Sequence, residues 1–313
     1  MALDSTDKIE VAVVLGGGSA LGLAHIGVLA VLEDFFEIKG IVGTSMGAMV
    51  GGVYASGKSP EWILEAFNHF KYQRLLNPLH FDFSMKGLFN GKIMEDELDA
   101  STDSMNIEDC PIPFCAVAYD IHSRRSILIN KGPLSKALRA SASLPYVFKP
   151  YKYGDYLFLD GGVEYPLPVN FAKQLHPDLT IVAVNVQEPL PKTATFFDED
   201  VSNSNSKKDI NFIESLLESV YGNQAYLSVN EIINENPDIV INTFNSKFSF
   251  KDFNKADDFY EIGKKAAQKV VSNYLAEQRK YDPLYIYKKQ LARIKKSITD
   301  KLPLLKELTD PKR

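Results

Sequence analysis

The chain has 313 residues, of which 45% are hydrophobic and 24% charged, so it can bury a sizeable core in one large or two small domains. Its formal net charge is −5, but residues 278–313 carry a net +7 and the remainder −12. An acidic main body argues against a nucleic-acid partner. The two cysteines, Cys110 and Cys115, are too few for a disulfide framework and lack metal-ligand spacing.

The first residues do not have the basic stretch followed by an apolar stretch that marks a signal peptide. The longest apolar runs are much shorter than the roughly 20 residues of a membrane-spanning helix. We therefore expect a cytoplasmic protein, and nothing in the sequence indicates a metal or another cofactor. The sequence leaves the oligomeric state open.

The first predicted element is a buried strand at residues 9–15, where nearly every side chain is apolar and many are β-branched. Glycines at 16–18 end it, and apolar residues at helical spacing predict a helix over 21–35. A short strand at 38–42 then leads through a sharp turn into a helix of small residues at 45–56. This alternation predicts an α/β fold with a mostly parallel central sheet and helices on both faces.

Strands and helices continue to alternate along the rest of the chain. Further strands are predicted at residues 114–119, 126–129, 156–159, 180–186 and 239–242. Further helices are predicted at residues 61–69, 133–141, 169–174, 210–234 and 256–277. Residues 192–209 are polar and show no periodicity, which predicts a loop.

A possible nucleophile lies in the run Gly43-Thr44-Ser45-Met46-Gly47, between a predicted strand and a predicted helix. In a nucleophile elbow, the serine occupies a strained turn at the end of a strand, and flanking glycines allow the close backbone approach. The N-terminus of the following helix also favours negative charge at the serine oxygen. The alternative is a glycine-rich packing turn, but the strand–turn–helix context favours Ser45 as a nucleophile.

A glycine-rich loop, Gly16-Gly17-Gly18, follows the first predicted strand. Successive glycines can point their backbone N–H groups into one concavity, and acyl transfer needs such donors for its tetrahedral oxyanion. Dinucleotide binding is the alternative, but it requires Gly or Ala at the position of Leu21. We therefore favour an oxyanion hole.

The dipeptide Asp160-Gly161 closes the predicted strand 156–159. Asp160 is expected at the edge of the sheet where α/β proteins place their sites. Taken alone, an Asp-Gly pair more often marks a simple turn.

Four motifs in this order resemble the bacterial patatin-like phospholipases. They are residues 16–29, residues 43–48, the sequence Arg-Ala-Ser-Ala-Ser-Leu-Pro at 139–145, and Asp160-Gly161-Gly162. The resemblance covers about residues 9–277, which we assign to one hydrolase domain, followed by a basic helical extension at 278–313.

The resemblance implies a serine ester hydrolase that acts on lipid acyl esters. It implies a catalytic dyad in which Ser45 is the nucleophile and Asp160 its base, with an oxyanion hole at residues 16–18. One departure is Leu21, which stands where such families usually carry a basic residue. We expect Arg139 to have a supporting role, bracing the loop over the site.

Two other interpretations remain at this point. One is a triad of Ser45, Asp160 and His176 in an α/β-hydrolase fold, since the chain order Ser…Asp…His fits that fold. The other is a catalytically inactive protein that binds acyl lipids. The glycine loop before the elbow favours the dyad.

The basic extension offers a possible contact with membranes. Five apolar residues between 284 and 298 fall on one helical stripe, and lysine and arginine residues lie largely off it. Such a helix could rest on an anionic bilayer, so a peripheral membrane location is possible. The alternative is a helix that docks on the acidic body of the same chain.

Overall fold

The computed structural model describes residues 8–69, 91–189 and 211–280. By its internal contacts the chain divides into two units, residues 1–268 and 269–313. The boundary that we predicted at 277/278 stays a prediction. The predicted membrane-binding stripe at 284–298 and the predicted loop at 192–209 lie outside the described residues.

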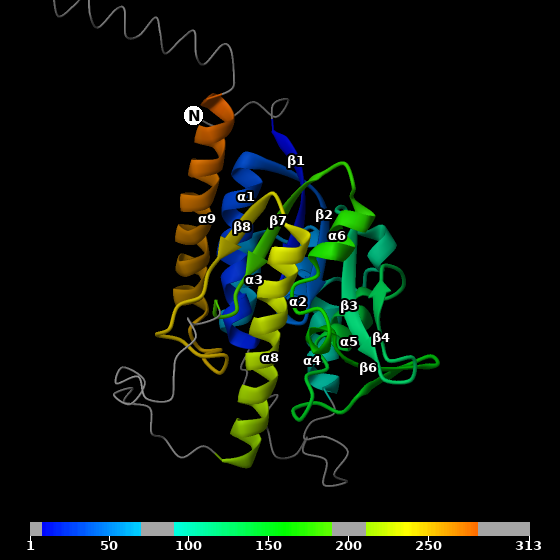
Figure 1. Ribbon diagram of the computed structural model, residues 1–313. Coiled ribbons are helices and arrows are strands. Elements are labelled where there is room, and N and C mark those ends of the chain that lie inside the picture. Colours follow the sequence, from blue (N-terminus) through cyan, green and yellow to red (C-terminus); the bar gives the residue numbers. More distant parts are fainter. Residues whose placement is uncertain (1–7, 70–90, 190–210, 281–313) are drawn as a thin grey trace, which may run out of the picture. The chain divides into compact units, whose positions relative to one another are not determined.

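The described residues of the first unit form an α/β fold around one mixed sheet, which confirms the predicted fold class (Figure 1). Its strands are β1 (Ile9–Leu15), β2 (Phe36–Thr44), β3 (Phe114–Asp120), β4 (Arg125–Ile129), β5 (Tyr151–Tyr153), β6 (Tyr156–Asp160), β7 (Thr180–Asn185) and β8 (Ile239–Asn242). Its α-helices are α1 (Ala24–Phe35), α2 (Met46–Ala55), α3 (Pro60–His69), α4 (Lys92–Ser101), α5 (Leu134–Ser141), α6 (Val169–Leu175) and α8 (Phe212–Glu235). The helix α9 (Ala256–Lys280) begins in this unit.

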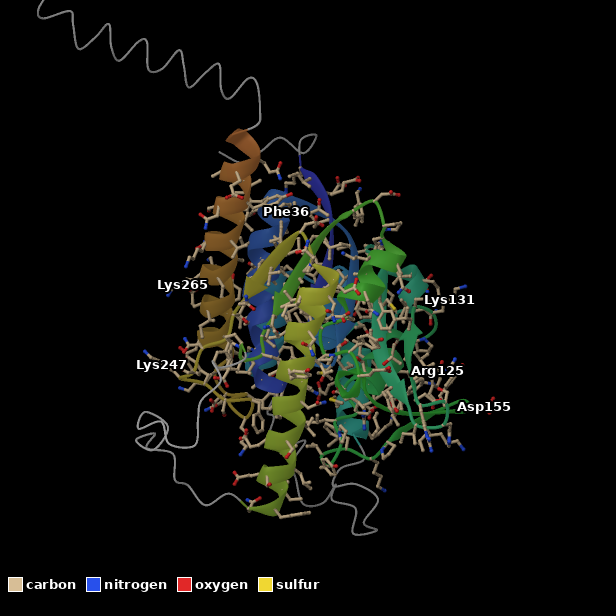
Figure 2. The ribbon with its side chains drawn as sticks, in the orientation of Figure 1. Phe36, Arg125, Lys131, Asp155, Lys247 and Lys265 are labelled. Carbon is tan, nitrogen blue, oxygen red and sulfur yellow. The ribbon has the colours of Figure 1, made fainter. Side chains whose placement is uncertain are left out.

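Most of the sheet is parallel, and one margin is antiparallel. Strands β8, β7, β1, β2 and β3 pair in that order, each parallel to the next. Strand β4 pairs with β3 in the antiparallel direction, and β5 and β6 also form an antiparallel pair. Figure 2 shows charged side chains, among them Arg125 and Asp155, projecting from the β4–β6 side. Charges at such a margin discourage pairing with another sheet.

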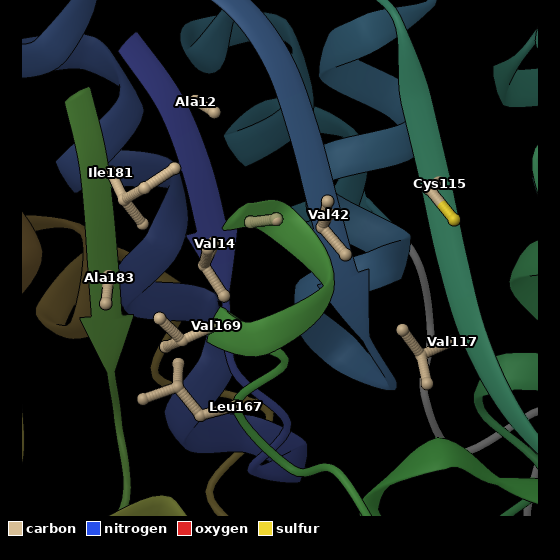
Figure 3. Packing of buried hydrophobic residues seen from close by; sticks show 10 residues of the cluster. Ala12, Val14, Val42, Cys115, Val117, Leu167, Val169, Ile181 and Ala183 are labelled. Carbon is tan, nitrogen blue, oxygen red and sulfur yellow. The ribbon is translucent and has the colours of Figure 1, made fainter. Parts of the chain in front are cut away.

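The two faces of the parallel strands are covered by different helices. On one face, Val14 and Val42 pack against Leu167 and Val169 at the start of α6 (Figure 3). Side chains of opposite parity, such as Leu15, face α2 instead. Because both faces are buried, the strands are almost continuously apolar, which is the pattern that made them predictable.

Some elements were not predicted from the sequence. They are the helix α4 and the three-residue strand β5. A 3₁₀ turn, Ser19–Leu23, precedes α1 where the pattern had predicted continuous helix from residue 21. Among the described residues, none of the helices combines the length and the apolar composition that crossing a membrane requires.

Glycines bring α1 and α9 into direct backbone contact. A Cβ on Gly27 would overlap the carbonyl oxygen of Tyr260, and a Cβ on Gly263 would overlap the carbonyl oxygen of Ala24. These clashes involve the main chain and cannot be relieved by a rotamer change.

We expect Gly27→Ala to lower the free energy of unfolding by about 1–3 kcal/mol, the usual range for overpacking. Urea denaturation checks this value. The matched control is Gly222→Ala on α8, where a Cβ would meet no atom within 4 Å. The control should be neutral or more stable by up to about 1 kcal/mol, because alanine favours a helix. Equal stability of Gly27→Ala and the wild type would contradict the close helix contact.

Candidate active site

Ser45 occupies a strained turn between β2 and α2. Its backbone has φ 54° and ψ −122°, which side-chain-bearing residues rarely adopt. A Cβ on Gly43 would lie 2.6 Å from the Cα of Ala48, and a Cβ on Gly47 would overlap the carbonyl oxygen of Leu15. The two flanking glycines therefore permit the close backbone approach that a nucleophile elbow requires.

A serine distant in the sequence holds this strained turn. The Ser45 amide donates to the Oγ of Ser141 at 2.9 Å, and that hydroxyl donates to the carbonyl oxygen of Val117 at 2.6 Å. Ser141 thereby ties the elbow to the neighbouring strand β3. The sequence placed Ser141 in a motif, but nothing in the motif indicated this partner.

Two strands running in opposite directions bring Asp160 next to the elbow. Thr44, at the end of β2, pairs with Val117 of β3, and Asp160, at the end of β6, pairs with Ala118. Along this stretch the other edge of β3 is occupied by β4, so β6 continues along the edge that β2 leaves. The carboxyl ends of β2 and β6 thus meet at consecutive positions of β3.

Asp160 is completely buried, and its carboxylate is held at one oxygen. The amide of Gly162 donates to Oδ1 at 2.7 Å, and the Asp160 amide donates to the carbonyl oxygen of Ser143 at 3.0 Å. Oδ2 has no hydrogen bond of ordinary geometry within the described part of the chain. One oxygen of the carboxylate is therefore available as a base.

Burial raises the pKa of Asp160 to about 6, because the ionised form is poorly solvated. The nearby Ser45 hydroxyl, the Gly162 amide and the charge on Arg139 each lower this pKa, but less than burial raises it. A base with a pKa close to neutrality is better matched to a serine proton than an exposed aspartate is.

The predicted oxyanion loop adjoins Ser45, since a Cβ on Gly17 would lie 3.3 Å from the Cβ of Ser45. Two of its amides already have backbone acceptors: Gly16 donates to Val184 at 3.2 Å, and Gly17 donates to Pro166 at 2.7 Å. Of these three amides, only that of Gly18 has no partner among the described residues. In this state, therefore, the loop offers one free donor of the three we predicted.

His176 does not complete a triad. His176 ends α6 and lies against Gly40, five residues before Ser45 on β2. A strand rises about 3.3 Å per residue, which separates the two sites by about 16 Å along the strand. The alternative triad with His176 is therefore wrong. The chain order Ser…Asp…His fitted a triad, but chain order does not determine how far apart residues lie in the fold.

His25 contacts the backbone of the glycine loop. It is fully buried, and its Nε2 lies 2.7 Å from the carbonyl oxygen of Gly16. Burial lowers the pKa of His25 to about 4, so the ring is neutral at pH 7 and its Nε2–H donates to that carbonyl. The sequence indicated a packed or surface histidine here but not this contact.

Arg139, for which we predicted a supporting role, lies in the last turn of α5. Its Nη1 donates to the Oγ of Ser143 at 2.8 Å, and its guanidinium lies 4.7 Å from the centre of the Phe148 ring. Burial lowers its pKa to about 10, and it remains charged at neutral pH. Because Ser143 also accepts the Asp160 amide, Arg139 fixes the backbone that carries the predicted base.

Ser45 opens into an apolar cavity of about 720 Å³. This volume lies within the range of roughly 300–1,000 Å³ that is usual for small-molecule sites. Met46, beside Ser45, lines the cavity together with residues of α3, α4 and α8. The apolar lining includes Met49, Val53, Trp62, Phe67, Met94, Leu98, Leu144, Val147, Phe148, Leu217, Tyr221 and Phe250.

The sheet, the elbow and the buried aspartate define the chain as an α/β protein of the nucleophile-elbow class. The sequence profile of the patatin-like phospholipases matches residues 13–173, which span both the glycine loop and Asp160. The chain therefore belongs to the patatin-like phospholipase family, as the motifs predicted.

Relatives within this family come from distant organisms. An uncharacterized NTE family protein of Mycobacterium tuberculosis is 36% identical over 220 residues, which cover 67% of this chain and 60% of that protein. Human patatin-like phospholipase domain-containing protein 6 is 30% identical over 183 residues, which cover 56% of this chain and 13% of that protein. The chain thus spans less than two thirds of the length of these relatives.

A solved structure supports the fold. VipD from Legionella pneumophila aligns with a TM-score of 0.52 at 11% identity, covering 86% of this chain and 67% of that one. At this level of identity the likeness concerns the fold alone.

Proposed function

We propose that this protein is a serine hydrolase of lipid acyl esters, with Ser45 as the nucleophile and Asp160 as its base. The observation that carries the proposal is that Ser45 lies in a strained elbow between a buried carboxylate and an apolar cavity. Membership of the patatin-like phospholipase family supports the same chemistry. The neuropathy target esterase of Drosophila melanogaster, 28% identical over 205 residues, carries an esterase in its name.

In the first half of the reaction, the Ser45 Oγ attacks the ester carbonyl carbon while its proton passes to Asp160. The carbonyl oxygen takes the electron pair of the broken π bond, and the free Gly18 amide donates to the resulting oxyanion. Collapse of this intermediate breaks the bond to the alcohol oxygen, which leaves with the proton that Asp160 had taken. The product of this step is an acyl-enzyme at Ser45.

In the second half, water attacks the acyl carbon and gives a proton to Asp160. The Ser45 oxygen then leaves as the fatty acid forms, and it recovers that proton. One carboxylate thus serves both halves without a histidine. Alcohols are better leaving groups than amines, so this dyad suits esters better than amides.

The cavity indicates which side of the ester it holds. Its lining is mainly aliphatic and aromatic, and it begins at the nucleophile. An acyl chain placed there removes apolar surface from water, which contributes about 25 cal/mol for each Å² buried. We therefore propose long-chain acyl groups as the preferred acyl donors.

The test uses a fluorophosphonate probe and a series of p-nitrophenyl esters of increasing chain length, with phospholipids and lysophospholipids as further substrates. We expect a covalent adduct on the peptide that contains Ser45, and kcat/KM that rises from acetate to long-chain esters. A folded wild-type protein that neither reacts with the probe nor hydrolyses any ester would overturn the proposal. It would favour a lipid-binding protein without catalysis instead.

A further inference from the structure

Two buried glutamines link the glycine loop to the helix α8. Gln187 follows β7 and is 3% exposed, and Gln224 lies on α8 and is 2% exposed. The Nε2 of Gln187 donates to the carbonyl oxygen of Gly17 at 2.9 Å and to the Oε1 of Gln224 at 3.1 Å. The mechanism described above uses neither side chain.

The Gly17 carbonyl fixes the orientation of both amide groups. A backbone carbonyl can only accept, so the atom of Gln187 that faces it must be the NH₂ group. The second hydrogen of that NH₂ group needs an acceptor, so Gln224 must present its Oε1 to Gln187. The NH₂ group of Gln224 consequently points away from Gln187.

That NH₂ group lies beside Gly162, in the turn that follows Asp160. The Nε2 of Gln224 and the Oδ1 of Asp160 both lie within 3 Å of the point that a Cβ on Gly162 would occupy. No hydrogen bond from this Nε2 to another described residue is present, and Gln224 lines the same cavity as Ser45 and Gly18. A donor that lines a cavity and has no protein acceptor is free to donate to a ligand or to water.

The oxyanion needs such a donor. The amides of Gly16 and Gly17 donate to backbone carbonyls, so the amide of Gly18 is the free donor of the predicted loop. Oxyanion holes are built from backbone N–H groups, from side chains such as Asn or Gln, or from both. Gln224 also lies beyond the residues 13–173 that match the family profile, so it belongs to the part of the chain that the family motifs do not describe.

We propose that the Gln224 side chain donates to the carbonyl oxygen of the bound ester and, together with the Gly18 amide, stabilises the oxyanion. Gln187 positions it through the bond to Oε1. The inference rests on the proposed ester hydrolysis and identifies a second donor for the same site. A capping box between Asn211 and Glu214 stabilises the start of α8, the helix that carries this donor.

The test compares Gln224→Met with the wild type on one p-nitrophenyl ester. Methionine has a similar length but no N–H, so kcat should fall on the order of 10²-fold while KM changes little. The rate of fluorophosphonate labelling should fall with it, because the phosphonyl oxygen would occupy the same position. Gln224→Glu keeps the acceptor for Gln187 but replaces the donor with a carboxylate, and it should lose at least as much.

The matched control is Ser228→Ala, one turn further along α8. Ser228 is also buried, its Oγ has no hydrogen bond to another described residue, and it does not line the cavity. This control should keep the wild-type kcat.

The outcomes separate the two proposals. Absence of labelling in the wild type would overturn the hydrolase proposal itself. If the wild type is labelled, a kcat within about threefold of wild type for Gln224→Met would overturn only the role of Gln224, and so would a change confined to KM. If Gln224→Met does not fold, Gln224→Glu decides the question by the same criteria.

Discussion

Replacing Ser45 with alanine is expected to reduce kcat on the order of 10⁶-fold. The substitution removes the atom that would form the acyl-enzyme, and water cannot use the same geometry, because the elbow points one particular oxygen at Asp160. Labelling by fluorophosphonate should vanish completely. Steady-state hydrolysis of a long-chain p-nitrophenyl ester measures the loss.

A matched control is Ser56→Ala, at the other end of α2. Ser56 is also largely buried, and its hydroxyl donates to the carbonyl oxygen of Val53 at 2.7 Å. This control should lose about 1 kcal/mol of stability and keep its activity. Turnover by Ser45→Ala above about 1% of the wild type, with folding intact, would exclude Ser45 as the nucleophile.

Replacing Asp160 with asparagine is expected to lower kcat by about 10²- to 10⁴-fold, the usual contribution of a general base. The wild type should also show a pH dependence in kcat/KM. The base acts in its ionised form and its pKa is raised to about 6, so kcat/KM should rise through pH 6 and level off above about pH 7. In Asp160→Asn this inflection should disappear.

The same substitution is expected to stabilise the fold at neutral pH. An aspartate has a pKa of about 3.9 in an unfolded chain, so between pH 4 and pH 6 the folded state binds more protons at Asp160. Stability from this group therefore falls as the pH rises through that window. A shift of two units corresponds to about 3 kcal/mol at pH 7. Asparagine is neutral and can still accept from Gly162, so it should recover up to that amount.

Asp120→Asn is the control for which we expect the opposite change in stability. Burial raises the pKa of Asp120, but the amides of Leu157 and Ser123 outweigh burial and hold the pKa at about 2. Asp120→Asn should therefore be less stable than the wild type at neutral pH. Urea denaturation at pH 5 and pH 8 measures both variants. If Asp160→Asn were destabilised like Asp120→Asn, the carboxylate would be a structural group instead of a strained base.

The parts of the site that are local in sequence could be predicted. Ser45 and its two glycines lie within five residues, and the turn they form depends mostly on their own backbone. The glycine loop is equally local, and the apolar runs beside it identify the central parallel strands. Family motifs then connected these segments to Asp160 without using any geometry.

Contacts between distant segments could not be predicted. Ser141 meets the Ser45 amide across 96 residues, and Gln187 meets Gly17 across 170. Neither contact leaves a periodic or compositional signal. The acceptors that occupy Gly16 and Gly17 also come from remote segments, so the sequence overstated the number of free donors. His176 failed as a base for a similar reason, since its position depends on the packing of α6 against β2.

The direction of β6 differs between the expectation from the sequence and the structure. An aspartate at the end of a strand was expected at the carboxyl edge of the sheet, as in a parallel arrangement. Strand β6 is instead antiparallel to β3, and Asp160 reaches the same place from the opposite side. The expected location was therefore found, but by a pairing that apolar patterns do not encode.

Because the carboxyl ends of β2 and β6 meet on β3, the register of the sheet sets the spacing between Ser45 and Asp160. Side chains along a strand alternate between faces, so a single-residue insertion or deletion within β6 would turn the Asp160 carboxylate to the opposite face. A change of length in the turn at Gly154, where an added Cβ would meet no atom within 4 Å, would leave that register intact. Natural variation in chain length should therefore be tolerated at the β5–β6 turn and excluded from the five residues that follow it.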